Sequence, residues 1–228
     1  MLPDSLIKEA RALNLTPAQF AAFMDIRLPG GGLPPAGDAP WETALPPSIS
    51  QKQGQCTLQD YASLPTGLRA QMIDGYIITQ GPVQPAHQAI IAELMYQLTV
   101  YIKETGSACK AITSPVRLYL PGSHTTVLAP DIALILHPGR ITGQRATALP
   151  EFAAEVLSPE SRCLDCIKKL DKYRDWGIKE YWIIDGQTQA VHCYQFAPKG
   201  GVIQKDHSFS DAIPVHTQKG LYLDFRKI

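Results

Sequence analysis

The sequence lacks several features that would place the protein in a common functional class. Among its 228 residues, no apolar run is long enough to cross a bilayer. Residues 1–11 have neither the basic start nor the apolar core of a secretory signal. Lys and Arg together number 21, as do Asp and Glu, so the net charge is zero. This balance argues against a broadly basic nucleic-acid coat protein, although it leaves room for a local basic groove. We expect no membrane partner.

Signature motifs and cysteines are sparse as well. There is no Gly-x-Ser-x-Gly elbow, phosphate-cradling glycine loop or dinucleotide fingerprint. Five cysteines, an odd number without an export signal, predict reduced thiols and a cytoplasmic location. Cys163-x-x-Cys166 could be a redox pair or, with His192 and Cys193, a zinc site. Because a second Cys-x-x-Cys is missing, two ordinary thiols are the favoured interpretation.

The chain divides into an N-terminal appendage and a main domain. Residues 6–26 have a helical pattern, with a fresh helix start at Thr16-Pro17. Residues 28–50 are rich in Pro and Gly, which is typical of a linker or an extended arm. We therefore predict a helical segment with an arm at 1–50 and a folded domain at 51–228.

The main domain has the order of helices and strands that an α/β protein shows. Helical spacing predicts long helices at 85–104 and 164–176, and a capped short helix is expected at 57–61. A hairpin is predicted at 71–79 around Asp74-Gly75. Further strands are predicted at 108–120, 127–136, 151–157, 181–185 and 190–196, and in the tail. This order predicts an α/β sandwich with a mixed sheet.

Two acids interrupt apolar strands. Asp131 opens the strand at 130–136, and Glu155 lies inside the strand at 152–157. A carboxylate in an apolar strand is costly unless a metal ion or a lysine compensates its charge. Lys169 lies on the helix that follows, and two acids with a lysine are what metal-dependent phosphodiester hydrolysis needs. The alternatives are a buried ion pair, or acids that reach water at strand ends.

The position of Lys169 on its helix leaves its role open. Lys169 lies at the border of a buried stripe made by Ile167, Leu170 and Tyr173. From this border its ammonium could point towards the strand of Glu155. From spacing alone, the favoured interpretation is an ordinary i,i+4 pair of Asp165 and Lys169 on a solvated face.

Several segments of the main domain form one pattern. They are Ile73-Asp74-Gly75, Pro130-Asp131-Ile132-Ala133, Glu155-Val156-Leu157-Ser158-Pro159, Asp165-x-x-x-Lys169-Leu170-x-x-Tyr173 and Gly177-Ile178-Lys179-Glu180-Tyr181-Trp182-Ile183-Ile184-Asp185. In this order and spacing they resemble the Uma-two family of restriction-endonuclease-like proteins, within the PD-(D/E)xK nuclease superfamily. The resemblance covers about residue 57 to the C-terminus. It implies a restriction-endonuclease-like core, which is a mixed β-sheet flanked by helices.

The resemblance implies a Mg²⁺- or Mn²⁺-dependent endonuclease that acts on nucleic acid, with DNA as the expected substrate. Asp131 and Glu155 match the two acids, which would hold the metal together with the backbone carbonyl of Val156. The superfamily lysine commonly lies two residues after the second acid, where this chain has Leu157. In this family it maps onto Lys169. Nuclease-like folds of this size often pair, so a homodimer is a further expectation.

Four residues are accessory candidates: Gln71, His87, Asp165 and Tyr173. Gln71 stands where family members usually carry a glutamate, and its amide keeps an oxygen ligand but loses the negative charge. His87 could contact phosphate near a helix N-terminus, although a single histidine is more often a structural hydrogen bonder. The change at Gln71 keeps an alternative open: a weakened or inactive nuclease-fold protein that binds nucleic acid or a protein partner.

Overall fold

The computed structural model describes residues 45–46, 49–81, 83–119, 122–158, 161, 164–197 and 201–228. The helix predicted at 6–26 and most of the arm at 28–50 lie outside these residues. Of that region, Ile49 is buried in an apolar cluster and Leu45 packs against the same cluster. The separation of 1–50 from the main domain stays a prediction.

The centre of the molecule is a six-stranded mixed sheet in the order β11-β10-β9-β8-β5-β3. Its strands in chain order are β3 (Lys110–Thr113), β5 (Ile132–Ile135), β8 (Phe152–Val156), β9 (Glu180–Asp185), β10 (Ala190–Phe196) and β11 (Val202–Ser208). Strands β8 and β9 run parallel, and every other neighbouring pair is antiparallel. The α/β architecture with a mixed sheet agrees with the prediction.

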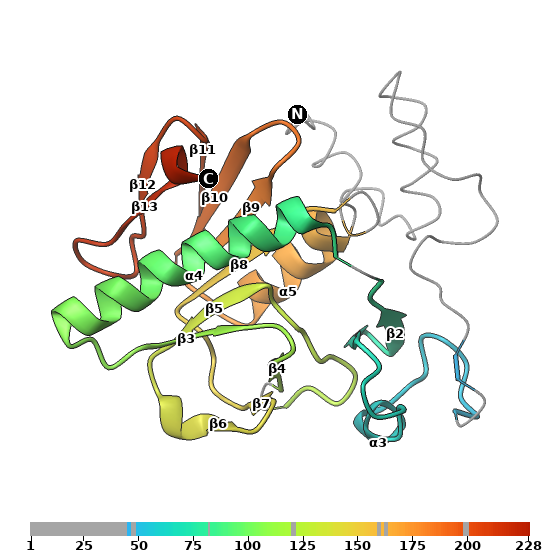
Figure 1. The fold of residues 1–228 in the computed structure, drawn as a ribbon. Coiled ribbons are helices and arrows are strands. Elements are labelled where there is room, and N and C mark those ends of the chain that lie inside the picture. The colour runs from blue at the N-terminus through green and yellow to red at the C-terminus, as the bar shows by residue number, and fades with distance from the viewer. Residues whose placement is uncertain are drawn as a thin grey trace.

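Helices cover both faces of this sheet, and its central strands β5, β8 and β9 are buried along their whole length. Helix α4 (Pro85–Thr105) crosses the front face in Figure 1, and α5 (Leu170–Asp175) lies behind the sheet. A π-helical stretch, η2 (Leu164–Lys169), leads directly into α5. The η2–α5 unit connects the parallel strands β8 and β9 as a crossover. The predicted helix at 164–176 is therefore present, although its first half is wider than an α-helix.

The long helix forms as its sequence predicts. Pro85 occupies the first turn, where a missing N–H costs nothing, and Gly106 ends the helix with φ 64°. The side chains that α4 buries against the front of the sheet are Ile90, Ile91, Leu94 and Leu98.

A smaller lobe packs beside the sheet around a third apolar cluster. It contains α3 (Leu58–Ala62), capped by Thr57 as predicted, and the hairpin of β1 (Ala70–Ile73) and β2 (Tyr76–Thr79). An ion pair between Asp74 and Lys172 ties the hairpin turn to α5. A three-stranded sheet adjoins this lobe, in the order β4 (Arg117–Leu118), β7 (Arg145–Ala146) and β6 (Ile141–Thr142), with η1 (Pro138–Arg140) before β6.

The C-terminal residues extend the front layer of the molecule. They form the two-stranded sheet of β12 (Ala212–Pro214) and β13 (Tyr222–Asp224), followed by η3 (Phe225–Lys227). Ile213, Leu223 and Phe225 belong to the same apolar cluster as α4. The predicted short strands of the tail are therefore confirmed.

Two predicted strands were too long. The segment 108–120 divides into β3 and β4, because β3 pairs with β5 whereas β4 pairs with β7. Within 127–136 only Ile132–Ile135 is a strand. Val127 and Leu128 instead form isolated bridges to Met72 and Leu118. Pro115 and Pro130 lie at the two interruptions, where a proline cannot donate a ladder hydrogen bond.

The described cysteines are buried and form no disulfide: Cys56, Cys109, Cys166 and Cys193. Cys166 packs in the cluster behind the sheet and Cys193 in the cluster in front. Because the sheet separates them, the zinc interpretation that combined them is wrong; Cys163 lies outside the described residues. No helix in the described ranges combines the length and the apolar composition needed to span a bilayer.

Candidate active site

Strand pairing brings the two predicted acids together. In the antiparallel pair of β5 and β8, Ile132 faces Ala154. One step further along this register, Asp131 faces Glu155. The backbone N–H of Asp131 donates to Glu155 Oε2 at 3.3 Å, and the N–H of Val156 donates to Asp131 Oδ2 at 2.9 Å. The main chain of two adjacent inner strands therefore holds both carboxylates at one end of these strands.

The side chain of Glu155 points to the rear of the sheet, towards α5. Residues of β8 alternate between the two faces, and Ala153 on the same face belongs to the rear cluster. There the hydroxyl of Tyr173 donates to Glu155 Oε1 at 3.0 Å, and Lys169 Nζ lies 2.9 Å from the same oxygen. Two side chains of the crossover helix thus engage one carboxylate oxygen.

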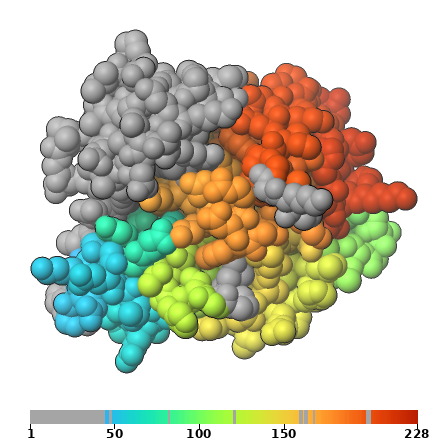
Figure 2. All heavy atoms as spheres, turned by 180° about the vertical axis from the view of Figure 1, so that it is seen from behind, coloured from blue at the N-terminus to red at the C-terminus, as the bar shows by residue number. Residues whose placement is uncertain are grey.

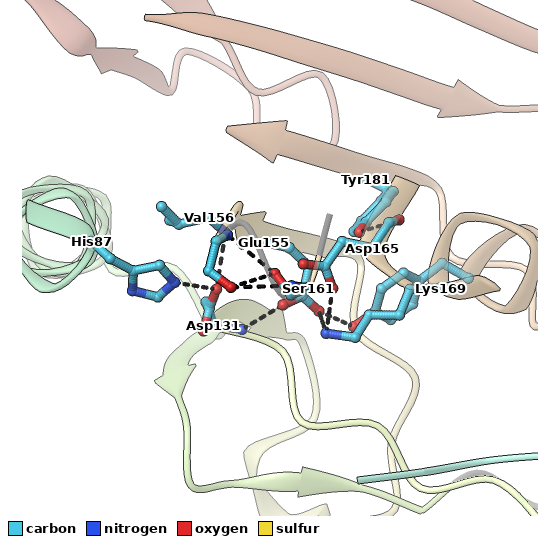
Figure 3. A network of polar contacts seen from close by, with 10 residues as sticks. His87, Asp131, Glu155, Val156, Ser161, Asp165, Lys169 and Tyr181 are labelled. Atoms are coloured by element: carbon cyan, nitrogen blue, oxygen red, sulfur yellow. Dashed lines mark hydrogen bonds and ion pairs between the residues drawn. The ribbon is translucent and has the colours of Figure 1, made fainter. Parts of the chain in front are cut away.

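Lys169 joins Glu155 to a third acid. Its Nζ lies 2.8 Å from Asp165 Oδ1, and Figure 3 shows the ammonium between the two carboxylates. The i,i+4 pair of Asp165 and Lys169 forms as spacing predicted. The solvated face expected for it is wrong, since Asp165 is 1% exposed and Lys169 2% exposed. Both belong to the π-helical stretch, a local widening that often accompanies functional sites.

His87 approaches the site from the front of the sheet, on helix α4. It lies in the first turn of α4, and its Nε2 is 3.2 Å from Asp131 Oδ2. Burial tends to lower the pKa of His87, but its contacts with Asp131 and with the backbone of Val156 outweigh burial, so the pKa is raised. The imidazole therefore contacts Asp131 and the backbone of Val156 at once, both of which were expected at a metal.

The site contains more acidic groups than basic ones. Burial, opposed by Lys169, raises the pKa of both Glu155 and Asp165, and Asp131 adds repulsion to each. Burial by itself would lower the pKa of Lys169, but the three surrounding carboxylates raise it above its ordinary value. Three buried acids thus share one ammonium and one imidazole. An added cation would relieve this imbalance.

Two contributors were missed from the sequence. Tyr181 donates its hydroxyl to the backbone carbonyl of Asp165 at 3.1 Å. Ser161 hydrogen-bonds Asp165 through its side chain, and its carbonyl accepts the N–H of Asp165 at 2.9 Å. Alternation along β9 would have placed Tyr181 on the rear face with Ile183, but nothing in the sequence indicated its partner.

Gln71 is buried, at 2% exposure, on the hairpin that α5 contacts. Its strand neighbour Ile73 packs in the rear cluster with Tyr173, whereas Ala70 and Met72 pack in the third cluster. Alternation therefore directs Gln71 to the same side as Ile73. Its Oε1 is buried and accepts no hydrogen bond from the described residues.

The site offers hard oxygen donors rather than a complete cage of side chains. In the described part of the chain, no three His, Cys, Asp or Glu side chains are placed so that they could hold a metal ion by themselves. The available donors are the carboxylates of Asp131 and Glu155 and the carbonyl of Val156, with water to complete the shell. Oxygen donors of this kind suit Mg²⁺ and Mn²⁺.

A mixed sheet that carries two acids at adjacent strand ends, with a lysine of the crossover helix beside them, defines a protein of the restriction-endonuclease-like class. Residues 58–225 match the Uma2 family, described as "Putative restriction endonuclease", and the chain belongs to this family. The resemblance predicted from the sequence is thereby confirmed, and it supports a nuclease-like function. No curated protein matches the chain.

A solved structure has the same fold. It is the crystal structure of a putative nuclease belonging to DUF820 from Anabaena variabilis ATCC 29413, with a TM-score of 0.61 and 24% sequence identity. The match covers 75% of this chain and 95% of that chain. At this identity the likeness establishes the restriction-endonuclease-like fold, with its mixed sheet between helices.

Proposed function

We propose that the protein is a metal-dependent endonuclease that hydrolyses phosphodiester bonds of DNA at Asp131, Glu155 and Lys169. The observation that carries this proposal is the contact of 2.9 Å between Lys169 Nζ and Glu155 Oε1, with Asp131 held beside Glu155 by the main chain. A structural ion pair would need one acid for one lysine. Here three acids surround a single buried lysine, an arrangement with an unmet need for positive charge.

The donors fit a divalent cation. Asp131, Glu155 and the carbonyl of Val156 would hold Mg²⁺ or Mn²⁺, and the excess of buried carboxylates supplies the charge that such an ion requires. When bound, the ion supplies a polarised phosphate oxygen and a water of lowered pKa. His87 lies against Asp131, so its imidazole would help orient that carboxylate.

Lys169 acts by charge rather than as a base. Its raised pKa keeps the ammonium protonated near neutral pH, so it has no free lone pair to accept a proton. Its N–H groups would donate to the attacking water or to a phosphate oxygen as negative charge develops there. Asp165 fixes the position of the ammonium, and Tyr173 fixes the Glu155 carboxylate next to it.

The test is cleavage of supercoiled plasmid and of single-stranded DNA, with Mn²⁺ or with EDTA. Glu155→Gln keeps the shape of the side chain and removes its charge. Glu180→Gln is the matched control, because Glu180 is also buried in a strand but has neutral partners. Cleavage that requires metal, persists in Glu180→Gln and vanishes in Glu155→Gln supports the proposal. Equal cleavage by Glu155→Gln would refute it.

A second candidate function is an inactive nuclease fold that binds nucleic acid or a protein. The unpartnered oxygen of Gln71 favours this candidate, because an amide stands where a fourth acid would add affinity for a cation. Gln71→Glu is the discriminating variant. If the native chain does not cleave DNA and Gln71→Glu does, the chain is an inactive member of its family. A homodimer and a cytoplasmic location stay predictions, to be checked by sedimentation and by cell fractionation.

A further inference from the structure

Two arginines lie directly opposite each other on the three-stranded sheet. Arg117 of β4 and Arg145 of β7 are partners in the strand register. Like charges in directly opposed positions destabilise a sheet unless something compensates them. No carboxylate pairs with either guanidinium among the residues that the structure describes, although the whole chain has as many acids as bases. This surface therefore keeps a local positive charge within a neutral protein.

Aromatic rings hold both guanidinium groups in place. The Arg145 guanidinium lies 4.0 Å from the ring centroid of Tyr119, and the Arg117 guanidinium lies 5.5 Å from that of Tyr61. The two rings meet edge to face, with their centroids 6.3 Å apart. The four side chains form a continuous ladder of arginine and tyrosine, which we call the Arg–Tyr ladder. Stacking fixes each guanidinium but leaves its N–H edge available for an oxyanion.

The two arginines differ in what occupies their donors. Arg117 is half-buried and donates Nη2 to the carbonyl of Leu68 at 3.2 Å. Arg145 is exposed, and its guanidinium stacks on the ring of Tyr119. Arg140 on η1 adds a second exposed positive charge, and the segment 138–147 contains no acid. The outward donors of this surface therefore come mainly from Arg145.

The ladder lies near the acidic site. Leu118, next to Arg117, exchanges backbone hydrogen bonds of 2.7 and 3.3 Å with Leu128. Leu128 precedes Asp131 by three residues, which span at most about 11 Å of extended chain. Figure 2 shows the β4 segment, in yellow-green, between the blue-to-teal lobe and the yellow β6–β7 segment, with α5 in orange beside it. The Leu118 Cα therefore lies within about 16 Å of the Asp131 Cα, which corresponds to about five base pairs along a duplex.

From these contacts we propose that the Arg–Tyr ladder binds the phosphodiester backbone of the nucleic acid whose cleavage is proposed at Asp131 and Glu155. This proposal rests on the proposed function, because that function identifies the bound polyanion as a nucleic acid. Guanidinium groups pre-organised by stacking suit phosphate oxygens, because the fork of donors matches two oxygens of one phosphate. Contacts to phosphates position a substrate without reading its sequence, so we expect no base specificity from the ladder.

The experiment measures binding separately from cleavage. The full chain in EDTA is titrated into fluorescein-labelled 20-mers, as duplex DNA, single-stranded DNA and single-stranded RNA, and anisotropy is followed at several salt concentrations. In Arg145→Gln we expect affinity to fall roughly tenfold at 0.1 M salt, and the slope of log K against log salt to decrease by about 0.9. Arg145→Lys keeps the charge but loses the stacked fork, so it should keep most of the slope and lose part of the affinity.

Lys205→Gln is the matched control. It removes one exposed positive charge from β11, at the far edge of the six-stranded sheet, and should leave the salt slope unchanged.

Native binding with equal losses in Arg145→Gln and Lys205→Gln would overturn the ladder and leave the nuclease proposal standing. Binding that needs Arg145 without any metal-dependent cleavage would support the ladder and refute the nuclease. A native chain that binds none of the three oligonucleotides would overturn the ladder. The preferred oligonucleotide distinguishes DNA from RNA as the source of the phosphates.

Discussion

Two buried glutamates in neighbouring parallel strands have different surroundings. Glu155 of β8 points to the rear of the sheet and meets Lys169, Tyr173 and further acids. Glu180 of β9 is fully buried and shares the front face with Trp182, whose indole N–H donates to it at 2.8 Å. Its other oxygen accepts the backbone N–H of Thr217 at 2.9 Å. Both are acids in apolar strands, so the hydrophobic pattern of the strands does not separate them.

The neighbours of each glutamate, rather than its burial, distinguish a reactive acid from a structural one. Glu180 has one neutral donor for each oxygen and fastens the C-terminal segment to the sheet. Burial disfavours the ionised form of Glu155, and the nearby acids, which share a single ammonium with it, add to this effect until another cation arrives. Burial is common to both, and it is the crowding of like charge that marks a candidate site.

The largest effect is expected when each glutamate is replaced by glutamine, which removes its charge. We expect Glu155→Gln to lower metal-dependent DNA cleavage by at least about 10²–10³-fold, because the proposed cation loses a ligand charge. Initial rates of plasmid nicking in Mn²⁺ measure this effect. Glu180→Gln should cleave at close to the native rate, and a comparable loss in both variants would show that the two acids do not differ in kind.

Removing the lysine tests the charge imbalance directly. Lys169→Met leaves Glu155 and Asp165 without their shared ammonium, so the metal-free protein should lose about 3–5 kcal/mol of unfolding free energy. Urea unfolding in EDTA measures the loss. Metal affinity should remain largely intact, and isothermal titration with Mn²⁺ checks it. Adding Asp165→Asn to Lys169→Met should recover part of the stability, and no recovery would contradict the proposed sharing.

The pH dependence of stability tests the environment of Glu155. Burial raises the pKa of Glu155 to about 8, so the folded protein keeps a proton that the unfolded chain releases near pH 4.5. The resulting stabilisation is complete below about pH 4.5 and is lost as the pH rises through about 8. The Tm of the metal-free protein should therefore fall between pH 5 and 8. That fall should flatten in Glu155→Gln and persist in Glu180→Gln; an identical profile in all three proteins would contradict the assignment.

The smallest effect is expected for the structural acid. In Glu180→Gln, the new amide N–H₂ faces one of two donors, either the indole of Trp182 or the N–H of Thr217. One buried donor is left unsatisfied, which costs about 1–3 kcal/mol. Thermal unfolding measures this loss, and hydrogen exchange should rise at the Trp182 indole N–H or at the Thr217 N–H, whichever donor loses its acceptor. Unchanged stability would mean that Glu180 does not fasten the C-terminal segment.

Much of the fold could be predicted from local pattern. Helix α4 could be predicted because helix periodicity and a glycine stop are properties of the local sequence. Its buried stripe consists of Ile90, Ile91, Leu94 and Leu98, and the helix ends at Gly106. The hairpin turn at Asp74-Gly75 was equally local. The strand at 108–120 was wrong in extent, because its division depends on β3 and β4 having different partners. Partner choice is a long-range property that periodicity does not contain.

The amino-acid sequence was enough to indicate which residues could carry chemistry: acids inside apolar strands and a lysine on the next helix, in the pattern of a nuclease family. The surroundings of each residue depend on the tertiary structure. It buried the Asp165–Lys169 pair that spacing favoured as solvated, and it set Asp131 opposite Glu155 through the register of β5 and β8. The reason is physical: the energy of a charge depends on burial and on neighbours distant in the chain, which strand pairing and helix packing fix.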